Sequence, residues 1–305
     1  MTKFLVKRVT QSLIAVLGIT LVVFLGLNVV GDPAELMLPP SASREDVELM
    51  RERMGFNDPL MVQYGRFLKN AVAGDFGMSY HYKEPAMDVV LERLPATIIL
   101  ASTALLISLI LGIPAGVISA IRRNTRTDAV IRTMALVGQC MPRFWFGILL
   151  ILLFSVNLKW LPTSGYESFK SLLMPAFTLG IPTTAIITRL LRSNMLEVMN
   201  KEYIDVARAK GLREFFVVMK HAFKNAISSV LTMFGLQLAT LIGGAVVTET
   251  VFGWPGIGRL MAQSITTSDF MVVLAIVFIV AVSFTVINLV VDILYSLINP
   301  RIRMQ

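Results

Sequence analysis

The chain has 305 residues, of which 55% are hydrophobic and only 16% are charged, and its mean hydropathy is +0.71. This composition excludes an ordinary soluble globular domain and indicates an integral membrane protein. Cys140 is the single cysteine, and the two histidines, His81 and His221, lie far apart in the sequence. We therefore predict no intrachain disulfide and no metal site.

Six runs with little or no charge are long enough, or nearly so, to cross the bilayer, which takes about 20 residues. They are residues 9–30, 96–121, 134–158, 171–188, 225–248 and 270–291. The first run exceeds the apolar core of a signal peptide, and no small-residue cleavage pattern follows it, so we interpret it as a retained helix. The predicted fold class is an all-α integral membrane protein with six transmembrane helices.

Residues 31–94, between the first two runs, have helix and turn signals of their own. Prolines make 31–43 a linker, Ser43 is placed to cap a helix over 44–54, and Gly55 is placed to end that helix. A second amphipathic helix is predicted over 59–72, followed by a tight turn at 74–80. This helical insertion either covers the outer mouth of the protein or receives a partner.

Basic residues set the orientation. With the N-terminus in the cytosol, the inner segments hold seventeen Lys and Arg against five Asp and Glu, whereas the outer segments hold ten against fourteen. Both termini are therefore predicted to be cytosolic. The net charge of +8 follows from this topology and requires no nucleic-acid partner.

This topology divides the chain into four regions. Residues 1–30 form the N-terminal tail and first helix, 31–94 the extracytoplasmic helical region, and 299–305 a cytosolic tail. Residues 95–298 form the transmembrane core, which contains a cytosolic segment at 189–224.

The outer loop at 249–269 is rich in glycine and proline at its centre, which predicts a segment that turns back on itself at the outer surface. Trp254, Pro255 and Gly256 are candidate contacts for an outer partner. No nucleotide-binding loop and no motif of a nucleophilic or zinc enzyme occurs in the sequence. We predict no catalytic residue, and energy for any transport must come from another chain.

Charged residues within membrane spans are the usual functional candidates, and two occur here, Arg143 and Asp292. An arginine at the membrane centre costs about 2.5 to 3.5 kcal/mol, so Arg143 either faces water, a carboxylate or carbonyl groups, or reaches the inner surface. Asp292 fits the cytosolic end of the last helix. The candidate pathway residues are Gln139, Arg143, Gln237 and Thr240. Polar residues in the spans, such as Ser108, can line a water-filled pathway or can equally form hydrogen bonds between packed helices.

Residues 202–225 form a charged segment between two apolar runs and must reach water on the cytosolic side. A helix over 202–210 is predicted, with Asp205 one turn before Arg208. Gly211 supplies a left-handed position, and a second short helix is predicted over 213–223. This helix–glycine–helix unit is either a rigid docking element or an ordinary solvated connector.

The order Asp205, Val206, Ala207, three residues and Gly211 resembles the EAA motif of ABC-importer permeases, the cytoplasmic segment that meets the ATPase. Asp205 and Val206 replace the usual Glu and Ala, and His221, Phe223 and Lys224 stand where the general motif has Ile, Leu and Pro. The run HAFKNA at 221–226 is similar to the branch that imports dipeptides, oligopeptides and nickel chelates. Further similar stretches, in the family's order, are GDPA at 31–34, GDFGMS at 74–79, LPAT at 94–97, WLPTSGY at 160–166, ETVFGWPGIGRL at 249–260 and NPRIR at 299–303.

The resemblance implies a type I permease subunit in the bacterial cytoplasmic membrane. Its expected partners are a homologous second permease, two cytosolic ATPases and an extracytoplasmic solute-binding protein. This chain itself would bind no cofactor, because ATP and Mg belong to the ATPases. The implied coupling residues are Tyr203, Asp205, Ala207, Arg208, Ala209, Lys210, Gly211, Leu212, His221 and Asn225.

The implied cargo is a peptide, with a nickel chelate or a glutathione-like solute as the alternative. A side chain at Gly211 is expected to obstruct the helix end and its seating. A self-contained channel or secondary carrier is the alternative from another class.

Overall fold

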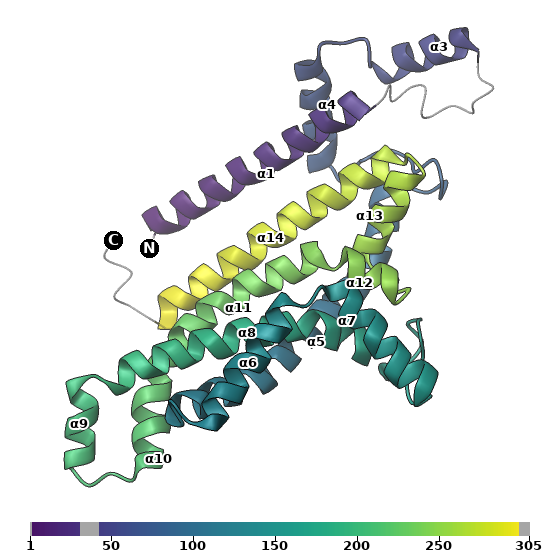
Figure 1. Ribbon diagram of the computed structural model, residues 1–305. Coiled ribbons are helices and arrows are strands. Elements are labelled where there is room, and N and C mark those ends of the chain that lie inside the picture. Colours follow the sequence, from purple (N-terminus) through teal and green to yellow (C-terminus); the bar gives the residue numbers. More distant parts are fainter. Residues whose placement is uncertain (1, 31–42, 299–305) are drawn as a thin grey trace. The chain divides into compact units, whose positions relative to one another are not determined.

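The computed structural model describes residues 2–30 and 43–298, and every regular element in these residues is helical (Figure 1). The predicted linker at 31–42 and the predicted tail at 299–305 lie outside the described residues. In chain order the helices and short π-helical segments are α1 (Thr2–Val30), α3 (Arg44–Met54), α4 (Leu60–Val72), α5 (Ala86–Ile121), α6 (Arg126–Cys140), α7 (Arg143–Leu150), η1 (Ile151–Asn157), α8 (Phe169–Met199), α9 (Glu202–Ala209), α10 (Glu214–Phe216), η2 (Val217–Phe223), α11 (Lys224–Gly244), α12 (Val246–Val251), α13 (Ile257–Thr266) and α14 (Phe270–Ile298).

The all-helical membrane fold is confirmed. Three helices, Ala86–Ile121, Phe169–Met199 and Phe270–Val291, are long and apolar enough to cross a membrane, and two bent helix pairs each qualify as one further span. Helix α1 contains a shorter apolar stretch, Leu13–Gly26. These elements are consistent with six spans.

The helices extend beyond the apolar runs in the sequence. Helix α5 begins at Ala86, ten residues before the predicted span at 96, and α8 continues to Met199 instead of ending at 188. The apolar run measures the thickness of the membrane, whereas backbone hydrogen bonding continues into water wherever the local sequence permits a helix.

The chain divides into two compact units, and the first comprises residues up to 97 together with 255–286. Its helix α3 has the predicted cap: the Ser43 hydroxyl accepts from the Asp46 backbone N–H, and the Asp46 carboxylate accepts from the Ser43 backbone N–H in return. The hydrogen bond that the Ser43 hydroxyl donates to the Asp46 carboxylate, followed by the one from the Ser43 backbone N–H, lowers the pKa of Asp46. Gly55 ends α3 with φ +69°. The predicted helix over 59–72 is present as α4, with Pro59 at its N-cap.

Aromatic side chains join helix α4 to α1 within this unit. The Tyr64 ring lies 5.6 Å from Phe24, and its hydroxyl donates to the Leu17 carbonyl oxygen at 2.8 Å. Phe67 and Phe76 extend the cluster, with ring centroids 5.9 Å apart. The insertion is therefore packed onto the first helix.

The second unit comprises residues 98–254 and the chain from 287, and its centre is the packing of α8 against α5, α6 and α11. Gly180 of α8 lies against α5 so closely that a Cβ atom there would be 2.8 Å from the Ala104 carbonyl oxygen. The Ser108 hydroxyl donates to the Gly180 carbonyl oxygen at 2.8 Å, so Ser108 forms a hydrogen bond between α5 and α8. Close backbone approach thus fixes α8 on α5.

The predicted third span is broken. Helices α6 and α7 meet at Met141 and Pro142 with a bend of 105°. Proline disfavours helical backbone in the preceding residue, and Met141 is extended, with ψ 125°. The predicted third span over 134–158 is therefore present as a bent pair of helices, and Arg143 lies at the start of α7, directly after the bend.

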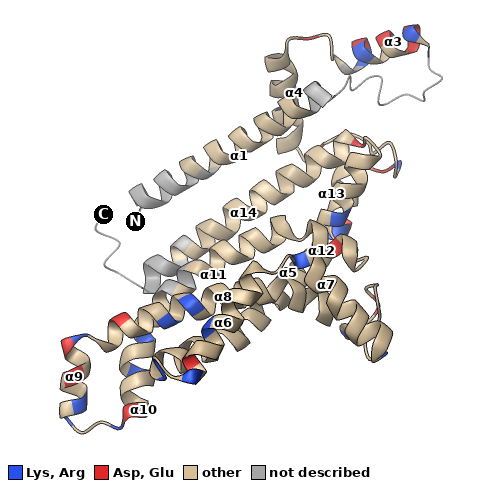
Figure 2. Cartoon of the chain, in the orientation of Figure 1, with Lys and Arg blue, Asp and Glu red and all other residues tan. Residues whose placement is uncertain are grey.

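The predicted helix over 213–223 is not a separate element. Residues 214–244 form α10, η2 and α11 in direct succession, so the second arm of the helix–glycine–helix segment is the beginning of the fifth apolar helix. No proline or glycine interrupts 213–223, and the helix has no local reason to stop. Figure 2 shows charged residues gathered along α9 and α10 and near the ends of α6 and α8, whereas α7 is almost free of them.

Candidate functional site

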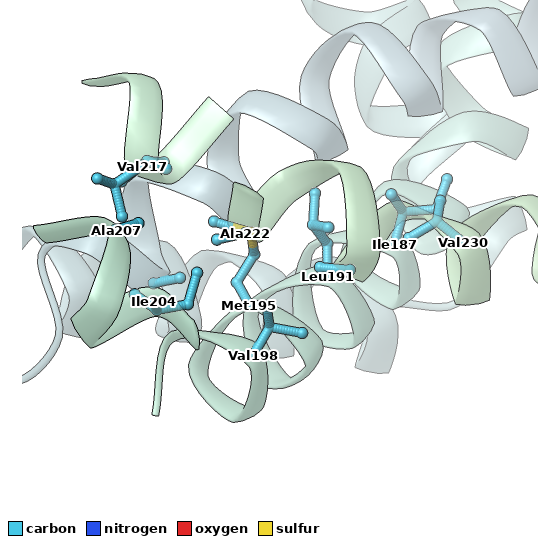
Figure 3. Close-up of a cluster of buried hydrophobic side chains, with 12 residues drawn as sticks. Ile187, Leu191, Met195, Val198, Ile204, Ala207, Val217, Ala222 and Val230 are labelled. Carbon is cyan, nitrogen blue, oxygen red and sulfur yellow. The ribbon is translucent and has the colours of Figure 1, made fainter. Parts of the chain in front are cut away.

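Helix α9 packs against neighbouring helices of the second unit through one apolar face. Ile204 is fully buried and Ala207 is nearly so, and they belong to a cluster of buried side chains that includes Met195 and Val198 of α8 and Val217 of η2 (Figure 3). The spacing of Ile204 and Ala207 matches one face of a helix. Ala207, a predicted coupling residue, is therefore a packing residue of this anchor.

The opposite face of α9 and the following turn are open to solvent. Tyr203, Val206 and Leu212 are exposed, as are Phe215 and Phe216 at the start of the second arm. Among the predicted coupling residues, Asp205, Arg208, Ala209, Lys210 and Gly211 are exposed as well. The segment thus combines a buried anchor with an exposed face that carries both charge and apolar area.

Arg208 closes the turn between the two arms. Its guanidinium donates to both carboxylate oxygens of Glu214, at 2.9 and 3.2 Å, and to Asp205 at 3.4 Å. The Asp205 contact confirms the predicted pairing, whereas Glu214 was missed because it lies beyond the turn. The hydrogen bonds to Glu214, followed by the charges of both carboxylates, raise the pKa of Arg208.

Gly211 has φ +78°, as the left-handed prediction requires, and its N–H donates to the Arg208 carbonyl oxygen at 2.9 Å. A Cβ atom at this position would meet no other atom within 4 Å. The expectation that a side chain would obstruct the helix end is therefore wrong for the chain itself. The backbone conformation, which L residues rarely adopt, is the constraint within this chain.

A second set of contacts joins α9 to the fifth apolar helix. The Asn225 amide donates to the Tyr203 hydroxyl at 3.2 Å and to the His221 carbonyl oxygen at 2.7 Å. The structure therefore brings three predicted coupling residues, Tyr203, His221 and Asn225, to one place. Two polar interactions therefore connect the arms of this segment. The Arg208–Glu214 ion pair lies near the turn, and the Tyr203–Asn225 hydrogen bond lies near the apolar helix α11.

The predicted pathway residues do not converge on one site. The Gln139 side-chain oxygen accepts from Arg189 at 2.6 Å, whereas the half-buried Arg143 donates to the Gly244 carbonyl oxygen at 3.4 Å. The Thr240 hydroxyl donates to the Leu236 carbonyl oxygen of its own helix at 2.7 Å, and Gln237 is half-buried on the same helix. The side chain of Asp292 lies outside the described residues.

The outer turn is more buried than predicted. Trp254 is only 2% exposed and packs edge-on against Tyr166 at 4.8 Å, so its side chain is an internal anchor instead of an exposed contact. Pro255 and Gly256 line a cavity of about 250 Å³ with Arg93 and Arg259, within the first unit. The sequence identified the turn, but its aromatic residue points inward because a buried indole gains more from packing than from water.

Three acidic residues that were placed in water by the sequence are buried: Asp128, Glu249 and Asp269. The Asp269 carboxylate accepts from the Ser79 hydroxyl within the first unit. Burial, followed by the charge of Asp269, raises the pKa of Tyr80. In the second unit, Asp128 accepts from Arg192 at 2.8 and 2.9 Å. All three lie in predicted loops, so no pattern in the sequence distinguished them from solvated acids. Within residues 2–30 and 43–298 no group of three or more His, Cys, Asp or Glu side chains could hold a metal ion.

Two family models match the chain. Residues 112–304 match the "Binding-protein-dependent transport system inner membrane component" family, and residues 1–101 match its N-terminal companion, "Binding-prot-dependent transport system membrane comp, N-term". The chain belongs to this family of transport permeases. It is a multi-pass protein of the inner membrane.

Curated relatives match along the whole length. The oligopeptide transport system permease protein AppB of Bacillus subtilis (strain 168) is 41% identical over 314 residues, with 99% of both chains covered. The glutathione transport system permease protein GsiC of Escherichia coli (strain K12) is 40% identical over 304 residues, again with 99% of both chains covered.

Solved structures share the fold at low identity. The inward-facing MetNI methionine ABC transporter matches with a TM-score of 0.58 and 16% identity, covering 70% of this chain and 97% of that one. A second match is an amino acid ABC transporter with histidines, with a TM-score of 0.52, 17% identity and coverages of 70% and 94%.

Proposed function

We propose that this chain is the permease subunit of an ATP-driven importer that moves peptide-like solutes into the cytosol. The observation that carries the proposal is the geometry at Gly211. A left-handed glycine joins a helix anchored in the core to the start of a membrane helix, and the face around the turn is exposed. Such a segment can move as a rigid body with a docked protein and thereby displace α8 and α11.

The partners follow from this role. A homologous second permease would complete the pathway, two cytosolic ATPases would engage the exposed face of α9, and an extracytoplasmic binding protein would deliver the solute. This chain would bind no cofactor and perform no catalysis, because ATP and Mg would belong to the ATPases. Both termini would be cytosolic, as the distribution of basic residues predicts.

The proposed division of the chain keeps the predicted boundaries. Residues 1–30, 31–94, 95–298 and 299–305 would be the first helix, the outer insertion, the permease core and the tail. Within the core, residues 189–224 would be the coupling segment. Pro255 and Gly256 remain candidates for contact with the binding protein through the outer cavity.

The names of the relatives support two cargoes. AppB is named for oligopeptides and GsiC for glutathione, at nearly equal identity. A peptide is the proposed cargo, and a glutathione-like solute is the second candidate because glutathione is itself a small peptide. A nickel chelate is the remaining alternative.

The test is to reconstitute the complete complex in liposomes with its binding protein and to measure ATP hydrolysis and uptake for each solute. Peptide-stimulated hydrolysis with ATP-dependent uptake is the expected result. Uptake by this chain alone, without ATPases or binding protein, would instead identify a channel or secondary carrier.

A further inference from the structure

A cavity of about 620 Å³ opens within the second unit, lined by residues of α6, α8 and α11. Its size falls in the range of small-molecule sites, about 300 to 1,000 Å³. Leu136, Leu190 and Met233 supply apolar wall. Of the predicted pathway residues, only Gln139 contributes to it.

Three arginines line this cavity: Arg132 of α6 and Arg189 and Arg192 of α8. Asp128, which is fully buried behind the wall, pairs with two of these arginines, Arg132 and Arg192. It binds Arg192 through two hydrogen bonds and lies 3.4 Å from the Nε atom of Arg132. One carboxylate beside three guanidinium groups leaves the cavity cationic.

The buried carboxylate also fixes the geometry of the wall. Asp128 accepts hydrogen bonds from the Ser119 hydroxyl at 2.6 Å and the Asn124 backbone N–H at 3.0 Å. Its orientation is therefore set from α5 and from the loop before α6, and the bidentate contact in turn orients Arg192. Such a preorganised guanidinium loses little conformational entropy when a ligand arrives.

Arg189 is held differently. Its Nη1 atom donates to the Gln139 side-chain oxygen at 2.6 Å, so the amide on α6 orients a guanidinium on α8. No acidic group forms an ion pair with Arg189 among the residues that the structure describes. Arginine has five N–H donors, so further donors remain for an anionic ligand.

We propose that this cavity binds the carboxylate of the transported solute on its way through the permease. Guanidinium groups match carboxylates in planar, two-hydrogen-bond geometry, and the apolar wall can accommodate uncharged side chains. Every peptide with a free C-terminus carries this group whatever its sequence, so the site would select a solute class instead of one compound. The inference rests on the proposed function and names the chemical group recognised.

The experiment measures solute binding to the purified complete complex in lipid-free detergent by isothermal titration. The probes are dialanine, tetraalanine and glutathione, together with dialanine amide, which lacks the carboxylate, and short-chain phosphatidylglycerol as a lipid anion. The variants are Arg132→Gln and Arg189→Gln, and the matched control is Arg126→Gln, an exposed arginine of α6 that does not line the cavity.

We expect at least one carboxylate probe to bind the wild-type complex and to bind both cavity variants at least tenfold more weakly, with the control unchanged. The amide should bind at least tenfold more weakly than dialanine. Arg189→Gln leaves the Asp128 contacts intact, so its effect cannot be ascribed to loss of that pair. An unchanged melting temperature of this variant verifies folding.

Three results would overturn the proposal: no carboxylate probe binds, the cavity variants bind as the wild type does, or phosphatidylglycerol alone depends on the arginines. A different result would contradict the importer assignment. If both variants take up peptide with unchanged concentration dependence, the cavity site is wrong but the importer function stands. If binding depends on the arginines but no probe is taken up in an ATP-dependent way, the importer function is wrong.

Discussion

Asp128 shows how much a single side chain can change the interpretation of this sequence. As an acid three residues after Thr125 in a loop that the sequence predicts to be cytosolic, it looks like an ordinary cap, and Thr125 does accept from its N–H at 3.4 Å. The carboxylate itself, however, is buried between helices and paired with Arg192, 64 residues away. A buried charge is tolerated only when it is paired and hydrogen-bonded, so both partners are needed together.

The variant Asp128→Asn removes this charge and leaves Arg192 without a carboxylate. Breaking a buried ion pair costs about 3 to 5 kcal/mol, and the partial exposure of Arg192 favours the lower end of that range. We expect a loss of about 3 kcal/mol of unfolding free energy, seen as a lower melting temperature in detergent. Glu197→Gln, which breaks the exposed pair with Lys201, should cost no more than about 1 kcal/mol. Equal effects of the two variants would contradict the role of burial.

A substitution at Gly211 can distinguish an effect on folding from an effect on coupling to the ATPases. Within the chain its Cβ position is empty, so Gly211→Leu should lose only about 1 to 2 kcal/mol, from the left-handed backbone. The fold should survive, whereas a side chain at a docking surface should reduce solute-stimulated ATP hydrolysis of the reconstituted complex strongly. Gly211→Asn, which tolerates the left-handed region better, serves as the conformational control. Full coupling in the Leu variant would remove Gly211 from the proposed docking surface.

At the scale of elements, helix contacts in this protein depend on small residues as much as on apolar ones. Gly180 permits α8 to approach the backbone of α5 in a way that no apolar pattern in α8 reveals. The sequence pattern likewise does not reveal the geometry of the broken third span. Pro142 signals a disturbance of the helix, but a bend of 105° depends on what α6 and α7 pack against.

The variant Gly180→Ala tests the close approach of α8 to α5. Its Cβ atom would lie 2.8 Å from the Ala104 carbonyl oxygen, so backbone must move. Overpacking of this kind costs about 1 to 3 kcal/mol, and the melting temperature should fall accordingly. Gly18→Ala in α1, where an added Cβ meets no atom within 4 Å, is the matched control and should be neutral or slightly stabilising. A neutral Gly180→Ala would show that the helices are less closely packed.

At the scale of the whole molecule, the distribution of basic residues predicts which segments lie on each side of the membrane, and the proposed function depends on this orientation. In a Cys140→Ser background, single cysteines replace the exposed residues Glu52 in α3 and Glu202 in α9. A membrane-impermeant thiol reagent applied outside should label the cysteine at 52 and not the one at 202. Inverted vesicles should give the reverse. Labelling of both from one side would contradict the assigned orientation.

The sequence by itself determined the membrane class, the approximate spans and the turn at Gly211. It also determined the helix over 44–54, whose Ser43 cap and Gly55 end are present as predicted. These are local properties: the length of an apolar run, a capping side chain or a glycine with positive φ acts on neighbouring residues and can be recognised in a short window.

Only the tertiary structure decided which charges are buried and which polar groups meet. The cavity with three arginines, the pair of Asp128 with Arg192 and the inward-facing Trp254 all join residues from different helices. Their energies arise from burial and from contacts across tens of residues of sequence, and these quantities do not exist until the helices pack. The turn at Gly211 was therefore predictable, whereas the proposed carboxylate site was not.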